Sequence, residues 1–385
     1  MLSERNDILY SVNIESILVI LLFIGGAQGL LLSAALVSVR RGNRTANRIL
    51  AVLLFFFSIM ILFHAVGHYH QHQPDLYNHR WLFHALFFII APLIYFYTKA
   101  LTKYNFRLRL KEYSLHLIPA FGAILVVLLF SEVSHSGEFS ALVDMVMLTL
   151  ITLQMLMYLI RMHFILRDHT KNIQNTYSSL EKINLLWLRF FIISQAVICP
   201  IALLIDVYKH DTYEVGYIWL LVSIFMCLTG YFGILQPEIF SGELQEEPLP
   251  AQIGKKKYER SALSPEQAEA ILQRLQTFMQ SSKPYVIPTL TLPVLSKQMN
   301  VSTHHLSQII NERLNKNFFE FINHFRVKEA KRLLKDPENQ HLTLAAIGFE
   351  SGFNSVSSFN SIFKKATSLT PSQYRSSDNL ASENL

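Results

Sequence analysis

Residues 352–375 read "GFNSVSSFNSIFKKATSLTPSQYR", and they decide the fold of the C-terminal part of this chain. Gly352 is suited to end one helix, and a second helix is expected to begin near Ser355. Within that second helix Phe359 and Phe363 recur at helical spacing and predict a buried stripe, whereas the small polar residues between them predict an outward face. The stretch is therefore typical of a helix-turn-helix unit.

A similar unit lies upstream. We expect a short helix from about Pro293 to Met299, a tight connection at Asn300 and Val301, and a following helix capped by Ser302. In that helix Leu306, Ile309 and Ile310 are expected to face inward. The expected outer side holds Thr303, His304, Ser307, Gln308 and Asn311.

Two further helices complete the expected C-terminal domain. A longer helix, 318–334, joins the two units and ends before Pro337. Its polar face is expected to hold Arg326, Lys328, Lys331 and Arg332. Farther upstream, Ser264, Pro265 and Gln267 predict a capped connecting helix over 263–283. That helix either packs on the domain that follows, or carries a signal or pairs with its own copy in a dimer.

The N-terminal part of the chain has a different character. The composition is 51% hydrophobic with only 16% charged residues, which is unusual for a water-soluble chain of this length. Seven apolar runs approach the length of about 20 residues that crosses a bilayer. They are 14–39, 48–66, 81–101, 115–130, 139–160, 185–207 and 216–235. The expected fold class is therefore all-α, with a seven-helix transmembrane bundle, a linker and a cytoplasmic helical domain.

Basic residues in the connections predict the orientation of this bundle. Lys and Arg concentrate in the first, third and fifth connections, for example Arg40, Arg107 and Arg167, and are scarce in the second, fourth and sixth. Because basic loops face the cytoplasm, the N-terminus is expected outside and the C-terminus inside.

Residues from about Thr291 to Arg375 resemble the DNA-binding domain of AraC/XylS-type transcription regulators, which consists of two helix-turn-helix units joined by a long helix. The matching residues are Ser302, Leu306-Ser307, Asn311, Phe321, Arg326, Ala330, Leu333-Leu334, Gly352-Phe353, Phe359, Phe363-Lys364-Lys365, Thr370-Pro371 and Tyr374-Arg375. One position departs from the family, which usually has Gly where this chain has Ser368. A left-handed helix end there costs on the order of 1 kcal/mol relative to Gly.

The resemblance implies that each unit inserts its second helix into the major groove, about one DNA turn apart. Base-edge contacts are then expected from His304, Ser307, Gln308 and Asn311 in the first unit, and from Ser357, Asn360 and Ser361 in the second. Phosphate contacts are expected from Lys316, Lys364 and Lys365. Double-stranded DNA is the partner implied, and the bacterial inner membrane the location.

Several residues of the membrane part are candidates for sensing. His68, His70 and His72 fall in the second connection, where they suit a transition metal, a pH response or only a solvated loop. Asp144 is expected inside the fifth span, where it either contacts a ligand or ion or bonds a neighbouring helix. Gly25 and Gly29 have the spacing that lets helices approach closely, within the bundle or in a dimer.

These observations support two functions of different classes. The first is a one-component transcription regulator that senses an external or intramembrane signal, a small molecule or an ion. The second is a transporter or ion-coupled membrane protein with a regulatory helical tail. A third reading makes the bundle a mere anchor. The sequence shows no catalytic constellation, so we expect no enzyme activity and no cofactor. A homodimer remains open.

The expected division of the chain follows from this reading. Residues 1–236 form the seven-span sensor, 237–262 the linker, 263–283 the connecting helix, 284–376 the DNA-binding domain and 377–385 a tail. The linker is expected because it combines three prolines, a run of acids and a run of lysines.

Overall fold

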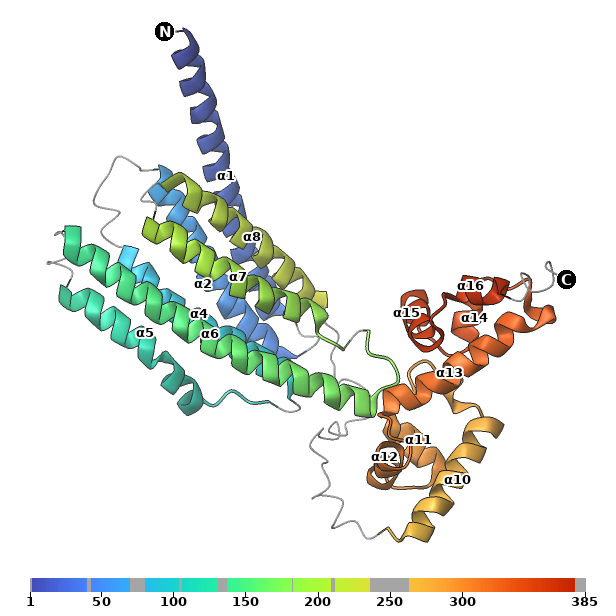
Figure 1. Cartoon of the computed structure of the whole chain (residues 1–385). Helices are drawn as coiled ribbons and strands as arrows, with labels where there is room; N and C mark the ends of the chain where they lie inside the picture. Colours follow the sequence, from blue (N-terminus) through green and yellow to red (C-terminus); the bar gives the residue numbers. More distant parts are fainter. Residues whose placement is uncertain are drawn as a thin grey trace. The chain divides into compact units, whose positions relative to one another are not determined.

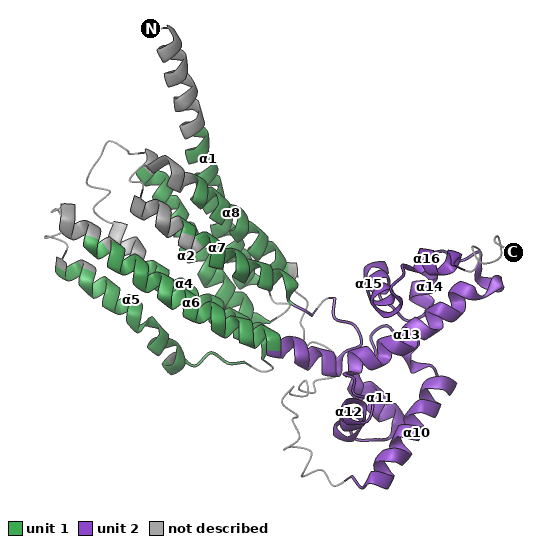
Figure 2. Cartoon of the chain, viewed as in Figure 1, with its two compact units in different colours: residues 1–167, 185–241 green, residues 168–184, 242–385 purple. Residues whose placement is uncertain are grey.

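The protein divides into two compact units (Figures 1 and 2). The computed structural model describes residues 2–39, 43–69, 80–103, 106–130, 137–181, 183–208, 212–235 and 263–377. Unit 1 comprises residues 1–167 and 185–241, and unit 2 comprises residues 168–184 and 242–385. Within the described ranges the regular structure is helical, with no strand beyond an isolated bridge between Tyr177 and Thr291. The predicted all-α class is confirmed.

Unit 1 consists of long apolar helices. They are α1 (Leu2–Ser38), α2 (Arg44–Tyr69), α4 (Arg80–Thr102), α5 (Leu110–Phe130), α6 (Gly137–Thr176), α7 (Leu186–Tyr208) and α8 (Thr212–Leu235), with α6 passing from unit 1 into unit 2 after Arg167. Helix α2 packs against α1, α4 and α8. A smaller core joins α4, α5 and α6 through Phe88, Ala120 and Ile151.

Small residues on α1 let this helix approach its neighbours closely. A Cβ atom on Gly25 would overlap the Ser223 side chain of α8, and one on Gly29 would overlap Ser58 of α2. Nearby, the Ser33 Oγ donates to the Ala51 carbonyl at 2.7 Å. The predicted role of these small residues in packing within the bundle is confirmed.

Five of the described helices have the length and composition to cross a membrane. They correspond to the first, second, third, fifth and seventh of the predicted spans. The fourth and sixth predicted spans are also helical, as α5 and α7, but the apolar described part of α7 is only Leu186–Ile198. The count of seven spans therefore stays a prediction.

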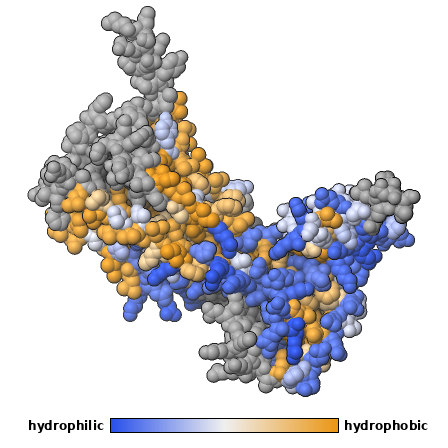
Figure 3. Space-filling view, in the orientation of Figure 1, coloured by the Kyte–Doolittle hydropathy of each residue, from blue (hydrophilic) through white to orange (hydrophobic). Residues whose placement is uncertain are grey.

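The surfaces of the two units differ in character (Figure 3). Many large apolar side chains of unit 1 face outward, including Leu31, Leu128 and Phe190. On the face that Figure 3 shows, the surface of unit 2 is mostly hydrophilic. Apolar side chains scattered over the outside of a helical bundle suit a lipid environment better than water.

Unit 2 contains shorter amphipathic helices. They are α10 (Pro265–Ser281), η2 (Pro284–Val286), α11 (Leu292–Met299), α12 (Thr303–Glu312), α13 (Phe318–Lys335), η3 (Pro337–Asn339), α14 (Leu344–Glu350), α15 (Val356–Thr367) and α16 (Pro371–Ser376). The predicted linker, 237–262, lies outside the described residues except at its margin, as do residues 378–385 of the tail.

Two hydrophobic cores form within unit 2, and α13 contributes to both. Its N-terminal half gives Phe318, Phe321 and Ile322 to a core shared with α10, η2, α11 and α12. Its C-terminal half gives Val327, Ala330, Leu333 and Leu334 to a core shared with α14 and α15. The joining helix therefore ties two small domains, each too small for a large core of its own, into one body.

Helix α10 packs on the domain that follows it. Its predicted capping box is present, since the Ser264 Oγ accepts from the Gln267 amide and the Gln267 side chain accepts from the Ser264 amide. Leu275 and Met279 are buried in the first core. Arg274 donates to the Met299 carbonyl at 2.9 Å. Of the two roles predicted for this helix, packing on the domain is confirmed.

Candidate nucleic-acid interface

The first helix-turn-helix unit has the predicted geometry. Helix α11 begins after the N-cap Thr291 and ends at Asn300, whose φ of 51° and ψ of 49° are left-handed. The Ser302 Oγ then accepts from the His305 amide at 3.1 Å and starts α12. Asn tolerates the left-handed region better than other non-Gly residues, which explains its place at the turn.

The outer side of α12 is more covered than the sequence predicts. The placement of Ser307 on that side is wrong, because its side chain is only 2% exposed. Ser307 directly follows the buried Leu306, and its small side chain fits against the core, where its Oγ and carbonyl both accept from the Asn311 amide at 3.2 and 2.8 Å. Gln308 is half-buried and donates to Glu312 at 3.1 Å.

The remaining predicted residues of the first unit keep some access to solvent. His304 and Asn311 are half-buried, as is Lys316 just beyond the end of α12. The Lys316 amide donates to the Ile310 carbonyl at 3.2 Å and so closes the turn that leads to α13.

The joining helix differs from the prediction at Arg326. This residue was expected on the polar face, but it is only 1% exposed. Its guanidinium donates to the Tyr285 carbonyl at 2.8 Å, to the Ile287 carbonyl at 2.9 Å and to the Ser178 carbonyl at 3.0 Å. Burial lowers the pKa of Arg326 to about 10, so the group is still a cation at neutral pH. Helical periodicity misplaced it because an Arg surrounded by carbonyls can be buried.

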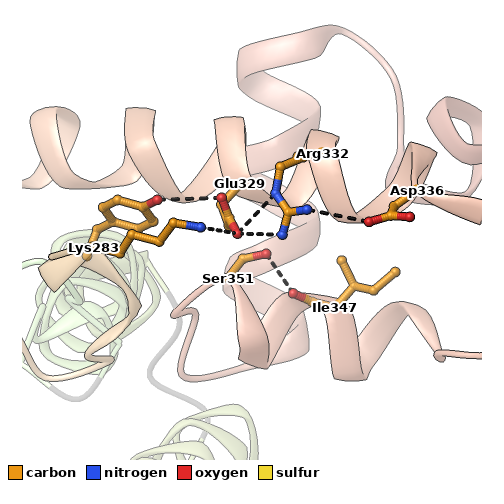
Figure 4. A network of polar contacts seen from close by, with 7 residues as sticks. Lys283, Glu329, Arg332, Asp336, Ile347 and Ser351 are labelled. Carbon is orange, nitrogen blue, oxygen red and sulfur yellow. Dashed lines mark hydrogen bonds and ion pairs between the residues drawn. The ribbon is translucent and has the colours of Figure 1, made fainter. Parts of the chain in front are cut away.

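A polar network fastens the residues before η2 to α13 (Figure 4). Glu329 accepts from the Lys283 Nζ at 3.2 Å and from the Arg332 guanidinium at 2.9 Å, and Arg332 reaches Asp336 at 3.4 Å. Burial tends to raise the pKa of Glu329, but the hydrogen bonds from Arg332 and Lys283 outweigh it and lower the pKa.

The second helix-turn-helix unit depends on a glycine. Helix α14 ends at Glu350 with Ser351 as its C-cap, and Gly352 follows with a φ of 92°. A Cβ atom on Gly352 would overlap the Tyr285 carbonyl oxygen and lie 2.7 Å from the Val286 Cα. Only glycine fits both the backbone conformation and this close approach of η2.

Helix α15 presents the most open polar face of the unit. Ser355 is its N-cap and accepts from the Ser358 amide at 3.0 Å. Phe359 and Phe363 are buried, as predicted. The predicted contact residues are all exposed and recur at helical spacing on one face: Ser357, Asn360, Ser361, Lys364 and Lys365.

The end of α15 is left-handed at Ser368, where AraC/XylS-type domains usually have Gly. Ser368 adopts a φ of 64° and a ψ of −3°, the left-handed region in which Gly is favoured. Its amide still donates to the Lys364 carbonyl at 2.8 Å, so the helix ends regularly despite the substitution.

The candidate sensing residues of unit 1 are only partly described. Asp144 lies in α6 and His68 in α2, but their side chains are outside the described part, and His70 and His72 are not described at all. Gln154, a polar residue of α6, donates to the Phe88 carbonyl at 3.3 Å. In the described ranges no group of three His, Cys, Asp or Glu side chains is placed to hold a metal ion.

The sequence does not predict that residues 168–184 belong to unit 2. They follow the fifth predicted span, where the residue pattern indicates only a basic connection. Ser178 is 1% exposed and Asn323 4% exposed, and the Asn323 Nδ2 donates to the Ser178 carbonyl at 3.3 Å. No local pattern around Ser178 signals a partner so far along the chain.

Comparison with known proteins supports the C-terminal assignment. Residues 295–377 match a family model described as a helix-turn-helix domain. Two proteins of Staphylococcus aureus, from strains COL and MW2, are each 36% identical to this chain over 95 residues, which is 25% of this chain and 12% of the relative. Both are named uncharacterized HTH-type transcriptional regulators. The chain thus matches about an eighth of the length of these relatives. No solved structure matches it.

Proposed function

We propose that this chain is a membrane-embedded one-component transcription regulator, because residues 295–377 form an AraC-type helix-turn-helix domain. Its C-terminal domain binds double-stranded DNA in sequence-specific fashion, and its N-terminal helices receive an external or intramembrane signal. The observation that carries the proposal is the exposed polar and basic face of α15, which belongs to the second of two helix-turn-helix units held by one joining helix.

The DNA contacts proposed for α15 follow from its chemistry. Asn360 can pair bidentately with adenine, and Ser357 and Ser361 can donate to or accept from several bases. Lys364 and Lys365, one turn farther along, suit phosphate oxygens. The exposure of all five side chains supports these roles.

The first unit makes a weaker contribution in this proposal. His304, Gln308 and Asn311 are proposed to reach bases, and Lys316 to reach a phosphate. Ser307 is not among them, since its side chain is buried. The amides of Gln308 and Asn311 already bond within α12, so DNA must compete with these intramolecular hydrogen bonds.

The proposed location is the bacterial inner membrane, with the N-terminus outside and the C-terminus in the cytoplasm. Five helices with the length and composition of membrane spans support it, as do the outward apolar side chains of unit 1. The basic first, third and fifth connections support the orientation. One span would suffice for an anchor, so the larger bundle favours a sensor.

The signal is proposed to be a small molecule or an ion that contacts Asp144 or the group of His68, His70 and His72. A homodimer of the chain is compatible with this proposal. Asp144 is proposed because ionisable side chains at membrane depth are costly and are often functional, and the histidines are proposed because imidazole binds transition metals and titrates near neutral pH. Replacing Asp144 with Asn is expected to abolish a signal response without changing DNA binding by the unstimulated chain.

The test of DNA binding uses the full-length chain in lipid nanodiscs. We expect it to enrich a defined motif from a random duplex pool, with an affinity that falls steeply as salt rises. Asn360→Ala should lose about 10- to 100-fold of the discrimination at one base position, the equivalent of about 1–3 kcal/mol. Asn311→Ala, the matched change on α12, should lose less because its amide is bonded to Ser307.

Two results would overturn the proposal. One is enrichment of no motif by the full-length chain at any salt concentration. The other is accumulation of a solute in vesicles that hold the chain, together with Asn360→Ala leaving promoter occupancy unchanged, which would favour the transporter instead.

A further inference from the structure

The C-terminal end of α6 belongs to unit 2. Helix α6 is continuous from Gly137 to Thr176, and from Asp168 onward its residues cluster with unit 2 (Figure 2). We call residues 168–184 the α6 extension. Beyond the helix, Tyr177 forms an antiparallel bridge with Thr291, and the Ser178 amide donates to the Leu290 carbonyl at 3.2 Å. The extension is thus paired with the backbone that leads into the first helix-turn-helix unit.

A buried cation anchors the α6 extension. The Arg326 guanidinium donates to the Ser178 carbonyl at 3.0 Å and to the Ser178 Oγ at 2.9 Å. The same guanidinium also holds the carbonyls of Tyr285 and Ile287 at the start of the domain. Because these bonds are charge-assisted and buried, they are stronger than neutral ones and fix the position of the extension.

This anchor places a carboxylate at the start of α15. The Ser355 Oγ, which caps α15 by accepting from the Ser358 amide, donates to the Glu181 carboxylate. An anion is favoured at a helix N-terminus, since the unpaired amides and the helix dipole attract negative charge. A DNA phosphate uses the same kind of position when a helix enters a groove.

We propose that Glu181 acts as an intramolecular competitor of DNA, in that its carboxylate occupies the N-terminal end of α15 and must leave before a phosphate can bind there. This inference rests on the proposed function. The competition is electrostatic as well as steric, since a carboxylate beside a phosphate repels it.

The test compares two single charge removals in the full-length chain in lipid nanodiscs. The probe is a duplex enriched from a random pool by both the wild-type and the Glu181→Gln chain, and affinity is measured by fluorescence anisotropy. Glu181→Gln should bind about three- to fivefold more tightly than wild type, which corresponds to about 0.7–1 kcal/mol, the upper part of the range for an exposed charge at a helix end. Glu338→Gln, an exposed acid of η3, is the control and should change affinity less than about twofold.

The outcomes separate this inference from the proposed function. If all three chains bind the duplex and Glu181→Gln is no tighter than Glu338→Gln, the competitor role is wrong while DNA binding stands. If none binds DNA, both proposals fall. Hydrogen exchange at the Ser358 amide checks that Glu181→Gln leaves the cap of α15 intact, so that a gain in affinity reports the lost carboxylate rather than a changed helix.

Discussion

The two helix-turn-helix units of this chain are built on one plan and differ in how open their second helices are. In α12 the predicted contact residues are half-buried or, at Ser307, buried, and two side-chain amides bond within the helix. In α15 every predicted contact side chain is exposed. The same local motif therefore yields different binding surfaces when the surrounding contacts differ.

The residue that turns the chain between the two helices also differs between the units. Asn300 turns the chain between α11 and α12. Gly352 turns it between α14 and α15, where the backbone of η2 leaves no room for a side chain. The second unit is therefore fitted against η2, and its geometry depends on contacts far along the chain.

Replacing Arg326 is expected to destabilise both helix-turn-helix units at once. Arg326→Met removes the buried guanidinium that donates to the carbonyls of Tyr285, Ile287 and Ser178. The Tyr285 carbonyl then loses its donor, whereas the Ile287 and Ser178 carbonyls still accept from the Leu290 amide and from Asn323. We expect the free energy of opening of unit 2 to fall by about 4 kcal/mol, since the change removes several charge-assisted hydrogen bonds, each worth about 1.5–3 kcal/mol, and leaves one buried carbonyl without its donor. Hydrogen exchange of α12 and α15 amides in the full-length chain measures it.

Arg332→Met is the control for this change, because Arg332 lies on the same helix but its side chain is 54% exposed. It should lower the free energy of opening by less than about 1 kcal/mol. Equal losses for the two variants would contradict the structural role of Arg326.

A second pair of substitutions tests the two turn residues, Gly352 and Asn300. Gly352→Ala should lower the free energy of opening of the second unit by about 3 kcal/mol, which combines left-handed strain with overlap on the η2 backbone. Asn300→Ala, at the matching turn of the first unit, should cost only about 1 kcal/mol. Hydrogen exchange measured separately for each helix gives both free energies of opening. A loss at Asn300 as large as that at Gly352 would show that the two turn residues are equivalent.

A third change acts on the end of α15 alone. Ser368→Gly should stabilise the second unit by about 1 kcal/mol, because Gly adopts the left-handed conformation of Ser368 without strain. The temperature at which unit 2 unfolds, monitored by hydrogen exchange at the amides of residues 364 and 368, should rise by a few degrees. Unchanged or lowered protection would mean that Ser368 makes compensating contacts.

The smallest expected effect concerns the network at Glu329. Glu329→Gln should cost about 0.5–1 kcal/mol at pH 7, since both cationic partners are partly exposed. The pKa of Glu329 is lowered in the folded chain, so its contribution is fully present above the ordinary Glu pKa of about 4.3 and is lost as the pH falls through the lowered value. Hydrogen exchange should therefore show the two chains converging in acid. A difference that persists at low pH would contradict the charge-based role.

Most of the local structure of unit 2 follows from neighbouring residues. Ser264, Ser302 and Ser355 cap the helices that the sequence predicts, and Gly352 ends α14 as expected. Caps and turns involve atoms only a few residues apart, so the pattern of side-chain types suffices to place them. The exposure of Asn360 and the burial of Phe359 follow from periodicity in the same way.

The residue pattern alone predicts the all-α class, the two helix-turn-helix units, the apolar N-terminal helices and the open face of α15. Long-range contacts, in contrast, bury Arg326 and Ser307 and bring residues 168–184 into unit 2, with Glu181 at the cap of α15. The physical reason is distance along the chain. Helical periodicity records which face of a helix is apolar, whereas the partners of Arg326 are backbone carbonyls present in every residue, and folding alone selects which of them it meets.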